Sequence, residues 1–351
     1  MRRLVRALTL SAAASLLSAC SLPYYAQAIH GELHLLRMRT PIKEVLTDPG
    51  TSPKLKAELT RVEQIRKFAV DVLDLPDNAS YTTYVDLHRP YVVWNVVAAE
   101  EFSVKPVRWC FPFAGCVSYR GFFHRKAAER FRSRLEARGY DTYAGGTTAY
   151  STLGHFADPV LNTMLAGGEE YVAAILFHEL AHQKLYVKGD SDFDEAFAMT
   201  IEQYGVVRWL QQRHDAAELA AYRIRLRRRA DFAQLVAQQQ RRLAKIYAGP
   251  GDAVQKRMEK AAAFAEMRSD YETMKRQRWG GATDYDAWFA QKLNNASLAA
   301  VATYRRWLPA LRSQLQKRGL SGFYNEMTQL AGLPQSERNR RLSVWLAESA
   351  G

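Results

Sequence analysis

Cysteine is scarce in this chain of 351 residues, which contains three. The 12 prolines and 20 glycines are also too few for a collagenous or low-complexity chain. Beyond the N-terminal segment, no apolar run is long enough to span a bilayer, and no repeat of 20–50 residues is visible. Hydrophobic residues make up 48% of the chain and charged residues 24%, so wholesale disorder is excluded and a large core is possible.

The charge balance is basic, with 49 basic and 36 acidic residues and a formal net charge of +13. Such a balance suits a nucleic acid or an anionic membrane surface. The N-terminus favours export instead, because Arg2, Arg3 and Arg6 precede a short apolar run over residues 7–17. We therefore expect no nucleic-acid partner.

Residues 17–20 read Leu-Ser-Ala-Cys and resemble a bacterial lipobox, in which the chain is cleaved before a cysteine that carries lipid. Residues 1–19 are therefore predicted to be a lipoprotein signal peptide, and Cys20 the lipidated N-terminus that anchors the protein to a membrane. A plain secretory signal is the alternative interpretation. Ser21 follows Cys20 where an aspartate would favour the inner membrane, so we expect the outer membrane of a bacterial cell envelope, facing the periplasm.

The two remaining cysteines, Cys110 and Cys116, are separated by five residues. An exported protein meets an oxidising compartment, so the spacing favours a disulfide. Two buried free thiols or a pair of metal ligands are the alternatives. A metal pair usually has closer spacing and further ligands nearby.

The pattern of apolar residues predicts an α+β, mostly helical fold. Residues 20–50 are predicted to form a tether and a first helix, and residues 51–351 a single domain. The elements expected within that domain are a helix at 53–74, strands at 81–85 and 91–97, a helix at 123–138, a strand pair at 140–150 that turns at Gly145-Gly146, and a mostly helical region from 171 onward.

The sequence His178-Glu179-Leu180-Ala181-His182 lies in a segment of helical composition. Residues four apart share one helix face, so His178 and His182 can bind one Zn²⁺ through neutral imidazole nitrogens. Glu179 lies beside them and can act as general base toward a water that the metal activates. A chance match on a core helix is the alternative, which the buried apolar approach over residues 173–177 makes less favourable.

A catalytic zinc site usually has a third protein ligand. After a turn at residues 187–191, Asp192 is expected to cap a second helix at 193–210. Glu195 and Glu202 are seven residues apart and therefore project from one face of that helix.

These residues resemble the gluzincin pattern of the aminopeptidase N family, in which Asn-Glu-Gly-Phe-Ala follows the two-histidine motif. Here the corresponding segment is Asp194-Glu195-Ala196-Phe197-Ala198. The resemblance implies that Glu195 is the third zinc ligand and that Glu202 supports the site from outside the ligand set. Glu202 is also the rival ligand, because 19 residues separate it from His182, a spacing that thermolysin-like enzymes use.

The chain as a whole more closely resembles a bacterial family described as putative aminopeptidases, predicted zincins with a lipoprotein signal. The resemblance covers most of residues 21–330 and implies a zincin-like metallopeptidase fold. A small mixed sheet from residues 80–150 is expected to pack on the zinc helix within residues 51–210. Residues 211–351 are expected to be helical and to close the cleft. The matching segments are 25–27, 119–123, 150–159, the zinc region, and 293–296 with Tyr304.

Candidate substrate contacts are less specific. Aminopeptidase N-like enzymes hold the substrate amine with a Gly-x-Met-Glu-Asn segment, which this chain lacks, and Asp158, Glu169 or Glu170 are the candidates for that role. Tyr304 and Asn295 are candidate donors to the developing oxyanion. Tyr150 and Ser151 belong to a segment, 150–153, that we expect to be an edge strand for an extended peptide.

Together these features predict a zinc metallopeptidase and aminopeptidase that hydrolyses peptide bonds, with Zn²⁺ as cofactor and a peptide as substrate. The alternative is a non-catalytic envelope lipoprotein that uses a zincin scaffold for binding or assembly. The intact Glu179 argues against it, because binding alone does not require a base. A structural zinc site is disfavoured, since such sites usually contain cysteine.

Overall fold

The computed structural model describes residues 22–111, 115–152, 154–302 and 306–349. The predicted signal peptide, Cys20 and Tyr304 therefore lie outside the described residues.

The helices are α2 (Leu22–Arg37), α3 (Ile42–Thr47), α4 (Pro53–Asp71), α5 (Arg125–Glu136), α6 (Asn162–Leu165), α7 (Glu169–Lys184), α8 (Ser191–Gln212), α9 (Ala216–Ala248), α10 (Ala253–Arg278), α11 (Asp286–Phe289), α12 (Asn295–Ala302), α13 (Leu308–Ala331) and α14 (Gln335–Glu348). The strands are β1 (Thr40–Pro41), β2 (Thr83–Val85), β3 (Val93–Ala99), β4 (Trp109–Phe111), β5 (Gly115–Val117), β6 (Arg120–Phe122), β7 (Asp141–Thr147) and β8 (Val160–Leu161). This arrangement confirms the α+β, mostly helical fold.

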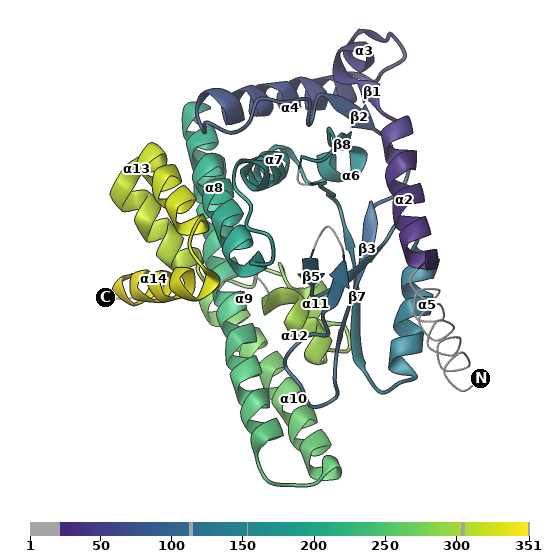
Figure 1. The fold of residues 1–351 in the computed structure, drawn as a ribbon, viewed down its shortest axis with the longest axis vertical. Coiled ribbons are helices and arrows are strands. Elements are labelled where there is room, and N and C mark those ends of the chain that lie inside the picture. The colour runs from purple at the N-terminus through teal and green to yellow at the C-terminus, as the bar shows by residue number, and fades with distance from the viewer. Residues whose placement is uncertain (1–21, 112–114, 153, 303–305, 350–351) are drawn as a thin grey trace, which may run out of the picture.

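The strands form three small sheets (Figure 1). A mixed sheet has the order β1-β2-β8, with β1 antiparallel and β8 parallel to β2. A second, antiparallel sheet has the order β6-β3-β7, and β4 pairs with β5 in a hairpin. Strands β2 and β8 share the core of α7, together with Val93 at the start of β3, while the rest of the antiparallel sheet packs against α5 and α12. The expected single sheet on the zinc helix is therefore divided.

Helix α7 is buried on several faces, as expected for a helix that is apolar around its circumference. Glu169 and Glu170 occupy its first turn, and His182 and Lys184 its last, an arrangement that complements the helix dipole. The core around it joins α4, α8, β2 and β8. It includes Leu59, Ile65, Phe68, Val85, Val160, Leu176, Phe177, Leu180, Phe193, Phe197 and Ile201.

Helix α8 lies directly against α7 because Gly205 permits a close approach. A methyl group at Gly205 would lie 2.6 Å from a ring carbon of Phe177 and 2.7 Å from a methyl carbon of Leu73. Core packing at this density leaves no space for that extra carbon. The absence of a side chain at Gly205 thus sets the distance between the two helices that carry the candidate metal ligands.

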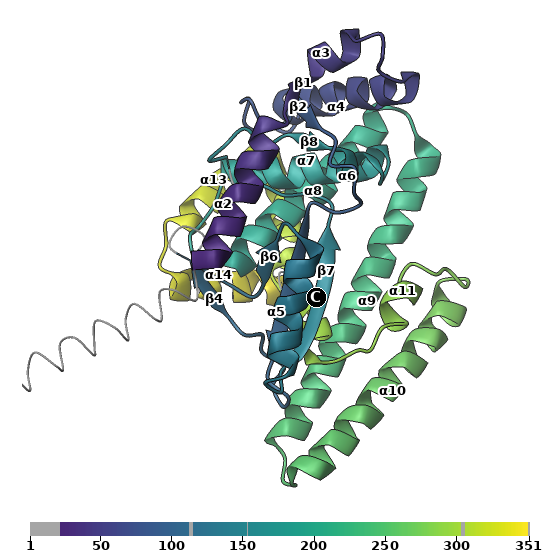
Figure 2. The same ribbon diagram turned by 90° about the vertical axis from the view of Figure 1, so that its right-hand side faces the viewer.

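The C-terminal helices support α8 from its other sides. Helices α9 and α10 form a long antiparallel pair that projects from the body of the molecule (Figure 2). Helix α13 packs on α8, where the rings of Phe323 and Phe197 stack with centroids 5.9 Å apart. Helix α14 contributes Arg338, whose Nε lies 2.7 Å from Oδ2 of Asp190 in a buried ion pair.

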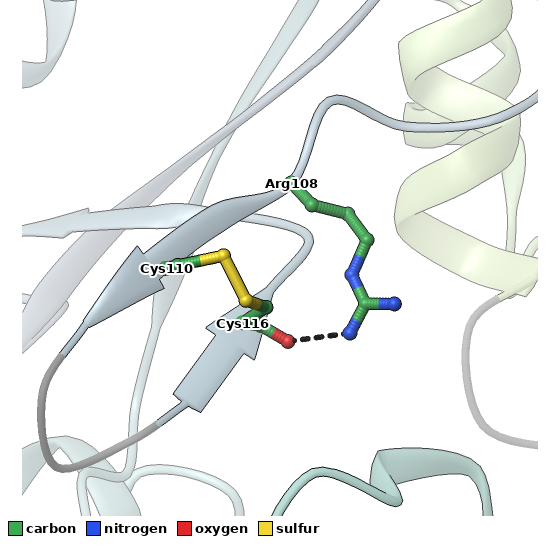
Figure 3. The surroundings of a disulfide bond; sticks show 3 residues. All are labelled: Arg108, Cys110 and Cys116. Atoms are coloured by element: carbon green, nitrogen blue, oxygen red, sulfur yellow. Dashed lines mark hydrogen bonds between the residues drawn. A yellow bond between two sulfur atoms is a disulfide. The ribbon is translucent and has the colours of Figure 1, made fainter.

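The β4–β5 hairpin carries both remaining cysteines (Figure 3). Cys110 and Cys116 face each other across the ladder and form a disulfide in the structure. Arg108 donates a hydrogen bond from Nη2 to the carbonyl oxygen of Cys116 at 2.9 Å, which adds a second link across the hairpin.

Three local expectations were wrong. Within residues 140–150 there is one strand, β7, which pairs with β3 along its length instead of folding back at Gly145. The cap of α8 is Asp190, whose side chain accepts from the Phe193 amide, and not Asp192. Residues 150–152 form no strand, because Asp158 draws this segment into a compact turn.

Within the described residues, no helix combines the length and apolar character needed to cross a bilayer.

The buried Asp190–Arg338 pair leads to a stability prediction. Replacing Arg338 by Met should lower the free energy of unfolding by about 3–5 kcal/mol, because it leaves the Asp190 carboxylate buried without its partner. Urea denaturation measures this change. Arg340→Met is the matched control, since Arg340 pairs with Glu337 at the exposed surface and its loss should leave stability nearly unchanged. Equal denaturation midpoints for the two variants would show that the buried ion pair stabilises the fold no more than the exposed one.

Candidate metal centre

The centre begins with two histidines on one face of α7. Nε2 of His178 lies 3.2 Å from Nε2 of His182, one helical turn further along. His182 is 5% exposed and His178 is 19% exposed, so the two imidazoles are largely shielded from water. Their facing nitrogens turn toward a common point.

Helix α8 brings the third candidate ligand to the same point. Oε2 of Glu195 lies 3.3 Å from Nε2 of His178, and Oε1 lies 3.7 Å from Nε2 of His182. Within the part of the chain that the structure describes, these three residues are the one group of potential ligands whose atoms all lie within 4.8 Å of one another.

The triad has the dimensions of a zinc site. Tetrahedral ligands at about 2.0–2.1 Å from zinc lie roughly 3.3–3.4 Å from one another. The three separations, 3.2, 3.3 and 3.7 Å, are close to this value. Two imidazoles and one carboxylate are also the donor set of a catalytic zinc site that keeps a fourth position open. The residues present therefore fit Zn²⁺.

Glu202 lies one step outside the triad. Its Oε2 is 3.1 Å from Nδ1 of His178, the ring nitrogen that faces away from His182. Its Oε1 is 3.6 Å from Nη1 of Arg229 on α9. A carboxylate on the far nitrogen of a histidine fixes the ring orientation and increases its basicity as a ligand. The geometry thus favours Glu195 as ligand and Glu202 as its support.

The electrostatics of the centre favour a cation. Burial acts to lower the pKa of His178, yet the hydrogen bonds with Glu195 and Glu202 outweigh it and raise this pKa well above its usual value. Burial and the neighbouring His178 lower the pKa of His182 to about 4. Burial acts to raise the pKa of Glu195, but His178 outweighs it and lowers this pKa. The carboxylates around His178 therefore favour positive charge at this point.

Glu179 lies beside the triad without joining it. Burial raises the pKa of its carboxyl group, and Glu195 adds to this effect while His178 opposes it. The nearby Ser151 hydroxyl group acts to lower this pKa, and it donates a hydrogen bond to Oδ2 of Asp158 at 3.1 Å. The expected base is therefore buried next to the ligands and has a hydroxyl group as a neighbour.

Asp158 is buried, and its carboxylate is engaged within the fold. It is 2% exposed, and it accepts hydrogen bonds from Ser151, from the Thr152 amide and from the Thr152 hydroxyl group. Its role in the structure is to hold the turn that carries Ser151. The amine-binding role expected for Asp158 does not agree with this geometry.

The two acids at the start of α7 are also engaged elsewhere. Glu169 forms ion pairs with Arg61 and Arg213, and Glu170 pairs with Arg225 of α9. They fix the N-terminus of α7 to its neighbours, more than two helical turns from His178. Neither is placed to hold a substrate amine at the metal centre.

Two other residues expected to contact the substrate, Asn295 and Tyr150, form contacts within the fold instead. The Asn295 side chain is fully buried, donates to the carbonyl oxygens of Glu100 and Glu101, and accepts from the Tyr247 hydroxyl group. Tyr150 forms a hydrogen bond with Glu32 on α2. Both residues fasten elements of the fold, so neither Asn295 as oxyanion donor nor Tyr150 as part of an edge strand agrees with the structure.

Two tyrosines near the triad, Tyr119 and Tyr186, were not predicted from the sequence to belong to the site. Desolvation of the Tyr119 hydroxyl group, together with Glu195 and Glu179, raises its pKa to about 12, although 37% of the residue is exposed. The ring of Tyr186 lies 6.3 Å from that of His182, centroid to centroid. Tyr119 belongs to the segment 119–123 that carries the family resemblance, which was the available signal. Because 59 residues separate it from His178 in the sequence (178 − 119 = 59), its proximity to the metal centre could not be predicted from spacing.

Two histidines four apart on one helix, a glutamate from the next helix and an uncoordinated glutamate beside the first histidine are features of zincin-type metal centres. A family model described as putative aminopeptidase matches residues 23–342, so the chain belongs to that family. Family membership supports a peptidase role. No curated protein and no solved structure matched the chain.

The ligand assignment predicts different metal contents for two glutamate variants. Glu195→Ala should lose its zinc, because two histidines remain as the protein ligands. Glu202→Ala should keep the three ligands and bind zinc about 10- to 100-fold more weakly. Elemental analysis and competition with a fluorescent chelator measure both effects. Full zinc in Glu195→Ala together with an empty Glu202→Ala would reverse the two roles.

Proposed function

We propose that the protein is a zinc-dependent peptidase, with Zn²⁺ held by His178, His182 and Glu195. The observation that carries this proposal is the convergence of the three ligand atoms beside a fourth carboxylate, Glu179, which is not a ligand. Bound zinc would supply Lewis-acid polarisation of the scissile carbonyl group and would lower the pKa of a water molecule at the open position.

In the proposed mechanism Glu179 accepts the proton from the attacking water and then donates it to the leaving amine. Burial raises its pKa, which brings this carboxyl group closer to the pH at which proton transfer in both directions is efficient. The neighbouring Ser151 hydroxyl group acts to lower this pKa and so favours the carboxylate form that accepts the proton.

Tyr119 is the proposed donor to the oxygen on which negative charge develops. With a pKa of about 12 its hydroxyl group stays protonated at neutral pH and can donate a hydrogen bond. Charge on that oxygen grows in the transition state, so the hydrogen bond strengthens there and accelerates the reaction. Tyr186 borders the same centre on the His182 side. Tyr304 stays a sequence-based prediction.

The central variant is Glu179→Gln. We expect it to retain zinc, because His178, His182 and Glu195 are untouched, and to lose activity about 10²- to 10⁴-fold, because the amide cannot accept a proton. A peptide substrate found by library screening gives the rate, and elemental analysis gives the metal content. Glu129→Gln is a matched control, since Glu129 lies on α5 and pairs there with Arg125.

Wild-type turnover in zinc-replete Glu179→Gln would remove Glu179 from the mechanism. An inactive wild type that binds zinc would instead favour the non-catalytic envelope lipoprotein.

We also propose that the protein is anchored to the bacterial outer membrane through Cys20 and faces the periplasm. The support is the basic segment, the short apolar run and the Leu-Ser-Ala-Cys sequence at residues 17–20. Labelling of cells with a fatty-acid precursor should mark the wild-type protein and leave Cys20→Ala unmarked. Equal labelling of both proteins would exclude lipidation at Cys20.

A further inference from the structure

A cavity of about 420 Å³ is lined by residues close in sequence to Tyr119 and Glu195, and it has no role in the mechanism described above. The segment before β4 and the β4–β5 hairpin form one wall, and the loop into α8 forms the opposite wall. Side chains of α9 and α12 contribute to the cavity as well. Its volume suits a side chain or the terminal residue of a peptide.

Both principal walls lead to the metal centre. Ser118 lines the cavity, and the next residue is Tyr119, whose hydroxyl group is close enough to Glu179 and Glu195 for their charges to raise its pKa. On the opposite wall Asp192 lines the cavity one helical turn before Glu195 on α8. On both walls, therefore, the chain runs directly from the cavity lining to a residue of the metal centre.

The charge of the cavity is set by two exposed cations, Lys105 and Arg108. Among the residues that the structure describes, neither forms an ion pair. Arg108 uses one nitrogen for the Cys116 carbonyl group, and Figure 3 shows its side chain extending beside the hairpin with the other nitrogens outside that hydrogen bond. Arg108 directly precedes β4, and the disulfide joins β4 to β5.

Two acids also line the cavity, and they offset only part of this charge. The charge of Asp190 is compensated by Arg338, with which it forms a buried ion pair. Burial raises the pKa of Asp192, and the charges of Arg306 and Arg108 oppose this effect. Asp192 therefore offsets one of the two cations, and the other leaves the lining positive. The N-terminus of α8 adds positive potential on the same wall.

We propose that this cavity is a substrate subsite for a carboxylate group, with Arg108 as its direct contact and Lys105 as a second charge. That the carboxylate belongs to a peptide rests on the proposed function. The group is either an acidic side chain or the C-terminal carboxylate of the peptide, which share this chemistry. A guanidinium group held at one nitrogen still presents donors to a carboxylate.

Equilibrium binding tests the subsite without requiring turnover. The probes are fluorescent alanine-based hexapeptides that carry Glu or Gln at each position in turn, with a free or amidated C-terminus. Fluorescence anisotropy measures their affinity for the full zinc-loaded chain. We expect one charged peptide to bind about tenfold more tightly than its neutral partner, the gain typical of a charge-assisted hydrogen bond. The Glu/Gln pairs report a side-chain source and the acid/amide pairs a C-terminal source.

Arg108→Gln should remove the preference, because the amide keeps a donor for the Cys116 carbonyl group and loses the charge. Arg276→Gln is the matched control, since Arg276 is an exposed residue of α10 that forms no ion pair within the described residues. Equal affinities for charged and neutral probes, or no measurable binding, overturn the proposal. A preference that persists in Arg108→Gln overturns it too.

The subsite and the peptidase proposal can fail separately. Charge-selective binding without cleavage supports the subsite and contradicts the peptidase proposal. Cleavage without charge-selective binding supports the peptidase proposal and contradicts the subsite.

Discussion

The close contact between α7 and α8 is the constraint on which the candidate site depends. One helix carries both histidines and Glu179, and the other carries Glu195 and Glu202. A shift of one helix past the other by a single turn would move ligand atoms by about 5.4 Å, more than any separation within the triad. Gly205 and the ring of Phe177 fix the distance between α7 and α8 sterically. The geometry of the candidate metal centre therefore depends on a contact between apolar atoms.

The C-terminal half of the chain stabilises this contact at several points. Arg229 of α9 faces Glu202, which in turn orients His178. Arg338 of α14 pairs with Asp190, the residue that caps α8 only five positions before Glu195. The helices after residue 211 therefore act on the position and charge of α8 and its acids, which explains why a site coded within about 25 residues belongs to a much longer domain.

Local patterns predicted the parts of the site that lie within one helix. The spacing of His178 and His182 placed both on one face, and the family resemblance placed Glu195 opposite them. The errors arose where a polar side chain has more than one possible partner. Asp158 and Asn295 are acid and amide groups that the sequence could assign to substrate, whereas folding uses them to satisfy buried backbone and hydroxyl groups. Tyr119 was not assigned a role because its proximity to Glu195 arises from the folding of the chain, which spacing along the sequence does not reveal.

Chelator-sensitive peptide cleavage tests the central claim most directly. The purified protein is incubated with a sequence-diverse peptide library, and mass spectrometry identifies new termini before chelation, after chelation and after Zn²⁺ is added back. The account predicts cleavage that stops when the metal is removed and returns with zinc. Cleavage that continues in the metal-free protein, or an intact library in the presence of stoichiometric zinc, would contradict it.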